Sequence, residues 1–208
     1  MTKLPRVLLV AHIGLPWGGP TQRYYDLIHS SISQHVRLDF FESSPNRKSF
    51  DEAGLINFRN VTGFLSMFAR YIIRYFRFKP SIVHIAATFG NSFIKHSPLI
   101  LIAKLLGSKV ILAPHCSISV FIPKSTIRLR YTKFILNRCD GMIIFSNEWE
   151  SIRNLTRKPR LILLKNAINL SNYLQIGRQT KITNQRTKLL YLGHIGVDKG
   201  IIDLLHAI

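Results

Sequence analysis

The chain of 208 residues carries 29 lysines and arginines against 10 aspartates and glutamates, so its formal charge is +19 and its sequence pI is about 10.5. With 47% hydrophobic residues and a mean hydropathy of +0.13, it has ample apolar material for a core, which excludes a disordered or low-complexity protein. Its two cysteines, Cys116 and Cys139, lack C-x-x-C spacing, so neither a disulfide framework nor a zinc site is indicated, and the reducing cytoplasm is the expected compartment.

Two apolar runs resemble targeting or membrane segments. The run 7–11 resembles the core of a secretory signal, but it ends after five residues at His12 and is predicted to be a buried strand. The run 98–106 is interrupted by Lys104 and is far shorter than the roughly 18 apolar residues of a spanning helix. We therefore expect no segment that crosses a bilayer.

Short β-branched and leucine-rich runs alternate with longer helical stretches. Strands are predicted at 6–10, 36–41, 82–86, 110–113, 141–145, 160–164 and 188–193. Helices are predicted at 21–33, 61–78, 91–106, 124–137 and 147–155. Several strands are continuously apolar, which is typical of a parallel sheet covered on both faces. The pattern predicts an α/β fold with a Rossmann-like, doubly wound, mostly parallel sheet.

Two polar stretches interrupt this alternation. Residues 42–60 have little periodicity and are predicted to form a long exposed loop, and residues 177–187 have the composition of a linker. We therefore expect a first domain over 1–176. Residues 188–208 supply one strand and the start of a helix, which we interpret as the opening of a truncated second domain.

Positive charge is concentrated in the middle of the chain, because no acidic residue lies between Glu52 and Asp140. Such a surface suits nucleic acid, anionic lipid or a phosphorylated substrate, unless it reflects a basic bias of the whole proteome. In the predicted helix 61–78, arginines 70, 74 and 77 form one stripe beside the apolar residues Phe64, Phe68, Tyr71, Ile72 and Tyr75. This pattern fits either a membrane-facing helix or a core face beside a solvated face.

Several residues at strand ends have chemistry suited to a ligand. Gly18 and Gly19 lie between the first strand and a helix, where backbone N–H groups can approach a phosphate; a tight turn is the alternative. His115 follows the strand 110–113 at the edge where α/β sheets bind ligands, and it can donate a hydrogen bond or move a proton. Lys199 lies at a strand–helix junction and can pair with a diphosphate.

Other candidate residues have mainly structural interpretations. His84 is predicted to be buried, without a reactive role. Ser146 or Asn147 is predicted to cap a helix, and Asn147 with Glu150 has the spacing of a capping box.

Six motifs in order resemble those of glycosyltransferase family 4. They are Gly18-Gly19, Pro80-Ser81-Ile82-Val83-His84, His115 after its strand, the segment 139–146 (CDGMIIFS), the segment 164–169 (LKNAIN), and the segment 190–194 (LYLGH) with Lys199-Gly200. The resemblance covers nearly the whole chain. It implies the two-domain GT-B architecture and sugar transfer from a nucleotide-diphosphate sugar with retention, without metal or cofactor.

The resemblance also implies roles for individual residues. The first domain would bind a glycan or lipid-linked acceptor, with His115 as the catalytic residue near the transferred sugar. Gly18, Gly19, His194 and Lys199 would bind the donor phosphates, with His194 standing where the family has arginine. The paired glutamates of the family's second domain have no counterpart in residues 1–208.

The expected function is thus sugar transfer in cell-envelope polysaccharide synthesis, in the cytoplasm or at the inner face of the cytoplasmic membrane. The alternative is a non-catalytic basic module that binds an anionic membrane surface or nucleic acid. Arg70, Arg74 and Arg77 are the candidate membrane or acceptor surface. Nucleic acid is the weaker candidate partner, because no RNA-binding signature or zinc-finger spacing accompanies the basic residues.

Overall fold

The computed structural model describes residues 4–14, 19–44, 58–88, 90–164 and 201–206. The chain divides into two compact units, Met1–Asn166 and Ala167–Ile208. In the second unit the structure describes helix α7 (Ile201–His206). The predicted linker 177–187 and strand 188–193 lie outside the described residues, as do Gly18, His194 and Lys199.

The first unit is built on a parallel sheet of six strands in the order β2-β1-β3-β4-β5-β6. Its strands are β1 (Arg6–Ala11), β2 (Arg37–Glu42), β3 (Ile82–Ala87), β4 (Lys109–Pro114), β5 (Gly141–Ile144) and β6 (Arg160–Leu163). All six were predicted to within one residue at each end. The Rossmann-like α/β fold is thereby confirmed, and its strand order reverses direction between β1 and β3.

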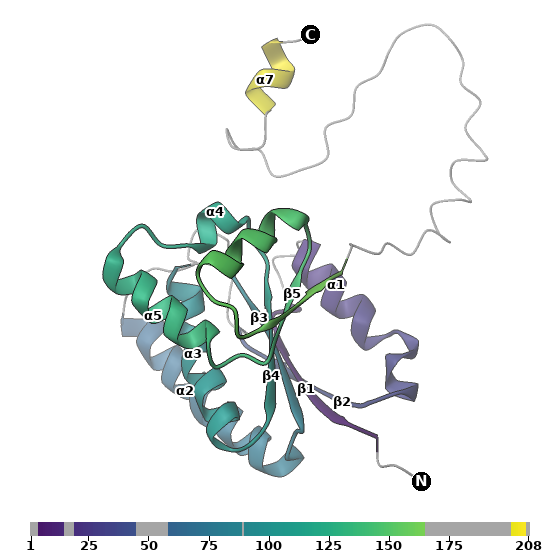
Figure 1. The fold of residues 1–208 in the computed structure, drawn as a ribbon. Helices are drawn as coiled ribbons and strands as arrows, with labels where there is room; N and C mark the ends of the chain where they lie inside the picture. Colours follow the sequence, from purple (N-terminus) through teal and green to yellow (C-terminus); the bar gives the residue numbers. More distant parts are fainter. Residues whose placement is uncertain (1–3, 15–18, 45–57, 89, 165–200, 207–208) are drawn as a thin grey trace, which may run out of the picture. The chain divides into compact units, whose positions relative to one another are not determined.

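Helices cover both faces of this sheet. They are α1 (Gly19–Ile28), α2 (Phe58–Phe78), α3 (Asn91–Leu105), α4 (Ile118–Phe121) and α5 (Thr126–Leu136), with 3₁₀ turns η1 (Ser31–Gln34) and η2 (Asn147–Asn154). Figure 1 shows α1 on one side of the sheet and α2, α3 and α5 on the other. The predicted loop 42–60 is too long, because β2 includes Glu42 and α2 begins at Phe58.

The main core lies between the sheet and the layer of α2, α3 and α5. Alternate residues of β1, Leu8 and Val10, are fully buried on this face, whereas Leu9 and Ala11 pack with α1 on the other. From α2, Tyr71 and Tyr75 are buried in the main core, and Phe64, Phe68 and Ile72 pack against it. The aromatic stripe of this helix is therefore its core face, and its interpretation as a membrane-facing stripe is wrong.

Helix α3 needs two local devices to fit between β3 and β4. Pro98 lacks the N–H that would bond the carbonyl of Ile94, and the hydroxyl of Ser97 donates to that carbonyl instead, at 2.7 Å. The helix ends at Leu105, and two residues later the φ of +85° at Gly107 allows the bond from Ser108 N to Ala103 O at 2.9 Å. The chain can then turn directly into β4.

Four predicted helices differ in detail from those in the structure. The segment 21–33 begins at Gly19 and ends at Ile28, with η1 after it, and the segment 61–78 begins at Phe58. The segment 124–137 begins later, at Thr126, and the short helix α4 precedes it. The segment 147–155 is a 3₁₀ turn, and the predicted capping box is wrong: Ser146 occupies the N-cap position and makes no side-chain capping bond. The Glu150 side chain is exposed there.

Candidate functional site

His115 lies where the sequence predicted it, directly after β4 at the carboxyl edge of the sheet. Its backbone N–H donates to the carbonyl of Ala87 at 2.9 Å, which continues the β3–β4 ladder by one bond and fixes the main chain. The side chain is half-buried. The histidine is therefore anchored on two central strands at the edge where such sheets bind ligands.

One tyrosine hydroxyl joins two histidines. Tyr24 of α1 is buried, and its Oη lies 2.7 Å from Nε2 of His115 and 3.2 Å from Nε2 of His84. We assign the hydroxyl proton to the shorter contact, so that Tyr24 donates to His115 and accepts from the Nε2–H of His84. This assignment places the proton of His115 on Nδ1, which makes no hydrogen bond within the described residues.

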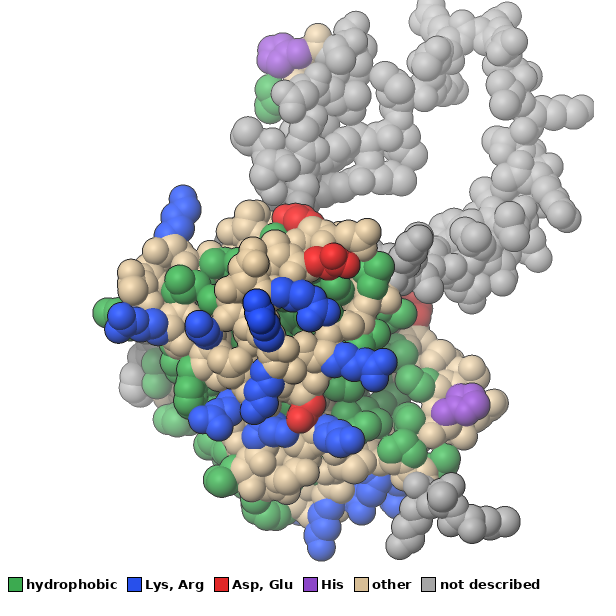
Figure 2. Space-filling model, viewed as in Figure 1, with side chains coloured by type: hydrophobic (Ala, Val, Ile, Leu, Met, Phe, Trp, Pro, Cys, Tyr) green, Lys and Arg blue, Asp and Glu red, His purple; other side chains and the backbone are tan. Residues whose placement is uncertain are grey.

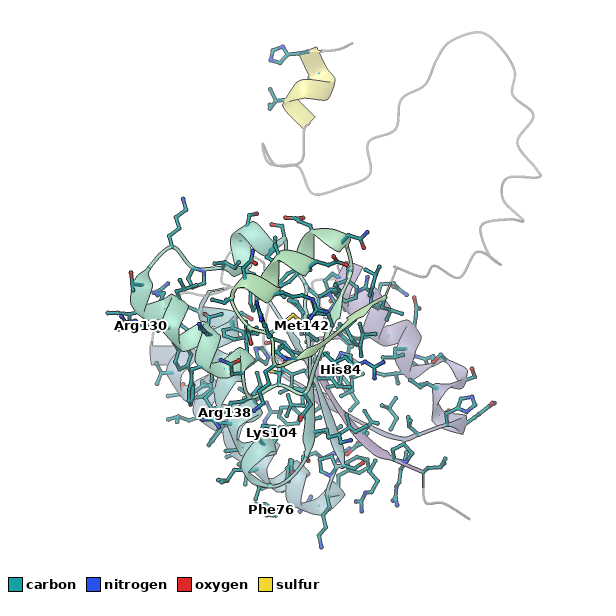
Figure 3. All side chains as sticks on the ribbon, in the orientation of Figure 1. Phe76, His84, Lys104, Arg130, Arg138 and Met142 are labelled. Carbon is teal, nitrogen blue, oxygen red and sulfur yellow. The ribbon has the colours of Figure 1, made fainter. Side chains whose placement is uncertain are left out.

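His84 projects from β3 toward α1, and Figure 3 shows it inside the body of the first unit. The sequence predicted its burial but not its bond to Tyr24. The two rings meet edge to face, with centroids 5.6 Å apart. His84 therefore acts through Tyr24, because it holds in place the hydroxyl that orients the ring of His115.

A stack of three planar groups completes the cluster. The ring of Phe145, which follows β5, stacks on His115 with centroids 4.9 Å apart and planes at 26°. The guanidinium carbon of Arg23 lies 3.8 Å from the centroid of the same phenyl ring. Arg23, Tyr24, His84, His115 and Phe145 are hereafter called the edge cluster, and they come from α1, β3 and the ends of β4 and β5.

The electrostatics of the edge cluster keep its histidines neutral. Burial, with smaller contributions from Arg23 and His84, lowers the pKa of His115 to about 3. Burial lowers the pKa of His84 to about 4 and raises that of the Tyr24 hydroxyl. At neutral pH the cluster therefore contains two neutral imidazoles, one neutral phenol and the cation of Arg23.

A second histidine at this edge is held by a carboxylate. Nδ1 of His12, just after β1, lies 3.0 Å from Oε1 of Glu42 at the end of β2. Glu42 also accepts the N–H of Ile13 at 3.0 Å and that of Ser44 at 2.8 Å. Burial works against ionisation of this carboxyl, but these hydrogen bonds outweigh it and lower the pKa of Glu42. The network ties the ends of β1 and β2 together.

The remaining predicted site residues are not brought to this cluster by the described structure. Gly19 is exposed as the first residue of α1, and a Cβ added there would meet nothing within 4 Å. The fold itself therefore does not require glycine at this position, which leaves room for a ligand near the start of the helix.

The arginines of α2 lie on its exposed side, away from the core. Arg74 is bound to Asp39 through Nε at 2.7 Å and through Nη2, so its charge is neutralised. Arg70 and Arg77 form no salt bridge within the described residues. A shallow hollow of about 350 Å³ lies at the Arg74–Asp39 pair and is lined by residues from the first half of β2 and the end of α2. We assign no chemistry to this hollow, because the strand-end histidines do not line it.

Reasoning from sequence missed Arg23, Tyr24, Phe145, His12 and Glu42. Each lies at a strand end or in the helix after β1, which is the one signal that could have marked them. Across the described residues, no group of three or more histidine, cysteine, aspartate or glutamate side chains is arranged to hold a metal ion.

No family model and no curated protein matches the sequence. Among solved structures, a conserved protein from Enterococcus faecalis V583 covers 77% of this chain and 92% of its own, with 10% sequence identity and a TM-score of 0.34.

Proposed function

We propose that this protein is a glycosyltransferase that moves a sugar, with retention, from a nucleotide-diphosphate sugar to a glycan or lipid-linked acceptor. The observation that carries the proposal is the placement of His115 at the carboxyl edge of the sheet, with Nε2 occupied by Tyr24 and Nδ1 without a partner in the described residues. The resemblance of the sequence motifs to family 4 supplies the reaction type. Synthesis of cell-envelope polysaccharide is the process in which we place it.

A neutral imidazole suits this reaction better than a charged one. As a sugar leaves its diphosphate, positive charge develops on the ring, and a cation beside it would oppose that change. A neutral Nδ1–H of His115 can donate to a sugar hydroxyl and position the ring without adding charge. The start of α1 offers backbone N–H groups for the leaving phosphate, and Gly19 places no side chain over them.

Sugar transfer is measured with the complete gene product. Radiolabelled nucleotide-diphosphate sugars are offered with extracted membrane lipids and with soluble glycans as acceptors. We expect label in a glycan or lipid product, because the enzyme stabilises the leaving diphosphate in the transition state. No transfer with any donor would refute the proposed function.

A membrane-surface role is the second candidate, because α2 exposes apolar and basic side chains together. Leu65 and Phe76 are 58% and 55% exposed, and Val61 and Ile73 lie on the same side of the helix. Arg70 and Arg77 flank them. Figure 2 shows further lysines and arginines spread over the visible face of the first unit, with few acidic groups. None of the described helices is long and apolar enough to cross a membrane, so contact would be with the surface.

Replacing both Arg70 and Arg77 with glutamine is expected to weaken binding to anionic liposomes about tenfold to thirtyfold, at roughly 1 kcal/mol for each cation near the surface. Arg74 is left in place because Asp39 neutralises it. Co-sedimentation with neutral and anionic vesicles at low and high salt measures the effect. The matched control replaces Arg128 and Arg130 of α5, which removes the same charge from another helix. Equal binding to both vesicle types would exclude the membrane role.

A further inference from the structure

Among the described residues, Arg23 is a cation of the edge cluster without a counter-ion. None of the salt bridges there includes it, and burial lowers the pKa of its guanidinium. Its Nη1 is buried and has no hydrogen-bond partner in the described part of the chain. A desolvated guanidinium N–H without an acceptor is costly, and such groups are usually satisfied by a carboxylate, a phosphate or a bound ligand.

The stack on Phe145 does not satisfy this donor. Arg23 lies over the face of the ring at 3.8 Å, and a guanidinium stacked in this way keeps its N–H groups in its own plane, directed away from the ring. The ring therefore fixes the orientation of the guanidinium without accepting a hydrogen bond from its in-plane N–H groups. Two parallel N–H groups on that edge match the spacing of two oxygens of a phosphate or carboxylate.

His115 offers a second donor beside the same phenyl ring. It stacks on Phe145, and with Nε2 bound to Tyr24 its Nδ1 has no described partner. One cation and one neutral imidazole donor at one edge, with no carboxylate paired to Arg23 in the described residues, form a site suited to an anion.

We infer that Arg23 is the anchor of an oxyanion subsite in the first unit and that it binds a phosphate or diphosphate group of a substrate. The inference adds a substrate-binding residue to the proposed function. It rests on that function, which supplies the phosphorylated substrate at this edge. The diphosphate of a nucleotide sugar and that of a lipid-linked acceptor both have this chemistry. A phosphate is favoured over a carboxylate because it carries more charge and more acceptor oxygens for a fixed donor fork.

The experiment uses the 208-residue chain at about 0.15 M salt, where exposed cations are screened over roughly 8 Å and a partly buried cation such as Arg23 is screened less. Sodium pyrophosphate, uridine diphosphate, geranyl diphosphate and sodium acetate are titrated separately, with calorimetry for Kd and amide NMR shifts for location. We expect the three diphosphates to bind and to shift the amides of Tyr24, His115 and Phe145, and acetate to bind much more weakly. Tighter binding of uridine diphosphate than of geranyl diphosphate identifies the donor as the source, and the reverse order identifies the acceptor.

Arg23→Gln is expected to weaken pyrophosphate binding by about tenfold to a hundredfold, the usual range for loss of a charge-assisted hydrogen bond. Arg23→Lys keeps the charge without the planar fork and should fall between Arg23→Gln and the wild type. Arg130→Gln removes the same charge from α5, where Figure 3 shows the side chain on the outer layer, and should change Kd less than twofold. Thermal melts establish that each variant is folded.

Equal Kd values for the wild type and folded Arg23→Gln would overturn the inference, as would shifts confined to amides away from the edge cluster. If Arg23→Gln does not fold, the wild-type shift map and Arg23→Lys decide by the same criteria. Diphosphate binding without sugar transfer by the complete gene product would refute the proposed function alone. Transfer without diphosphate binding at Arg23 would refute this inference alone.

Discussion

Lowering the pH from 7 to 5 is expected to reduce the free energy of unfolding by about 5 kcal/mol, a large part of the stability of a typical domain. In the folded chain, burial lowers the pKa of His84 and His96 to about 4 and that of His115 to about 3. In the unfolded chain they titrate near 6.5. As the pH falls below 6.5, the unfolded state binds protons that the folded state does not bind. The free energy of unfolding therefore falls until the histidines of the folded state titrate.

Two carboxylates extend the same loss to lower pH. Hydrogen bonds lower the pKa of Glu42, and Lys104 with the N–H of Val110 lowers that of Asp140, in each case against the effect of burial. Their contribution is present above their unfolded pKa values near 4 and is lost as the pH falls through the folded values. Urea titrations at pH 7.5, 6 and 5, followed by tryptophan fluorescence, measure the loss of stability that the histidines cause.

His96→Leu provides a matched test of this cause. Nδ1 of His96 donates to Ser92 O at 2.7 Å, whereas its Nε2 is buried without a partner among the described residues. Leucine removes the buried imidazole at similar volume, so the slope of stability against pH should fall by about a third. A free energy of unfolding that does not vary between pH 7.5 and 5 would contradict the account.

His115→Ala is expected to lower kcat for sugar transfer by about a hundredfold or more while the complete gene product stays folded. The side chain is only half-buried and its main role lies at the edge, so thermal melts should change little. Because the pKa of His115 is lowered to about 3, the rate should show no titration of His115 between pH 6 and 8. An unchanged kcat would return His115 to a structural role.

Tyr24→Phe separates positioning from contact with the substrate. The variant keeps the ring in the smaller core cluster but removes the hydroxyl that lies 2.7 Å from His115. We expect kcat to fall by about tenfold with KM nearly unchanged, because the tautomer and orientation of the imidazole are no longer fixed. A loss of stability without this split between kcat and KM would indicate that Tyr24 only packs.

The sheet could be predicted closely from sequence because its signals are local. Continuous apolar runs such as 7–11 and 110–113 lie on β1 and β4, in each of which four of the six residues are buried. Helix α2 was harder to interpret, because its aromatic and arginine stripes fit two environments equally. Tyr71 and Tyr75 face the core because other elements of the fold pack against them, and periodicity alone does not predict this packing.

The candidate site could be predicted only in part. His115 was found because it follows a strand, but the side chain that orients it is 91 positions earlier in the chain, and the stack on Phe145 joins a third segment. Such contacts depend on strand order, and the reversal between β1 and β3 is what places α1 over His84. The cation of Arg23 had no sequence signal beyond its place in the first helix.

The helix layers on the two faces of the sheet bury unequal numbers of apolar side chains, and the smaller layer should move more readily. On one side α2, α3 and α5 share the larger core, whereas on the other α1 is held by a small cluster around Tyr24, Leu9 and Ala11 within the described residues. Cooperative units with few buried apolar contacts open at lower free energy than the rest of a domain. Helix α1 should therefore exchange its amide hydrogens well before β3 and β4. Any ligand that contacts Arg23 should slow that exchange, because it binds to the folded form of the helix that carries this arginine.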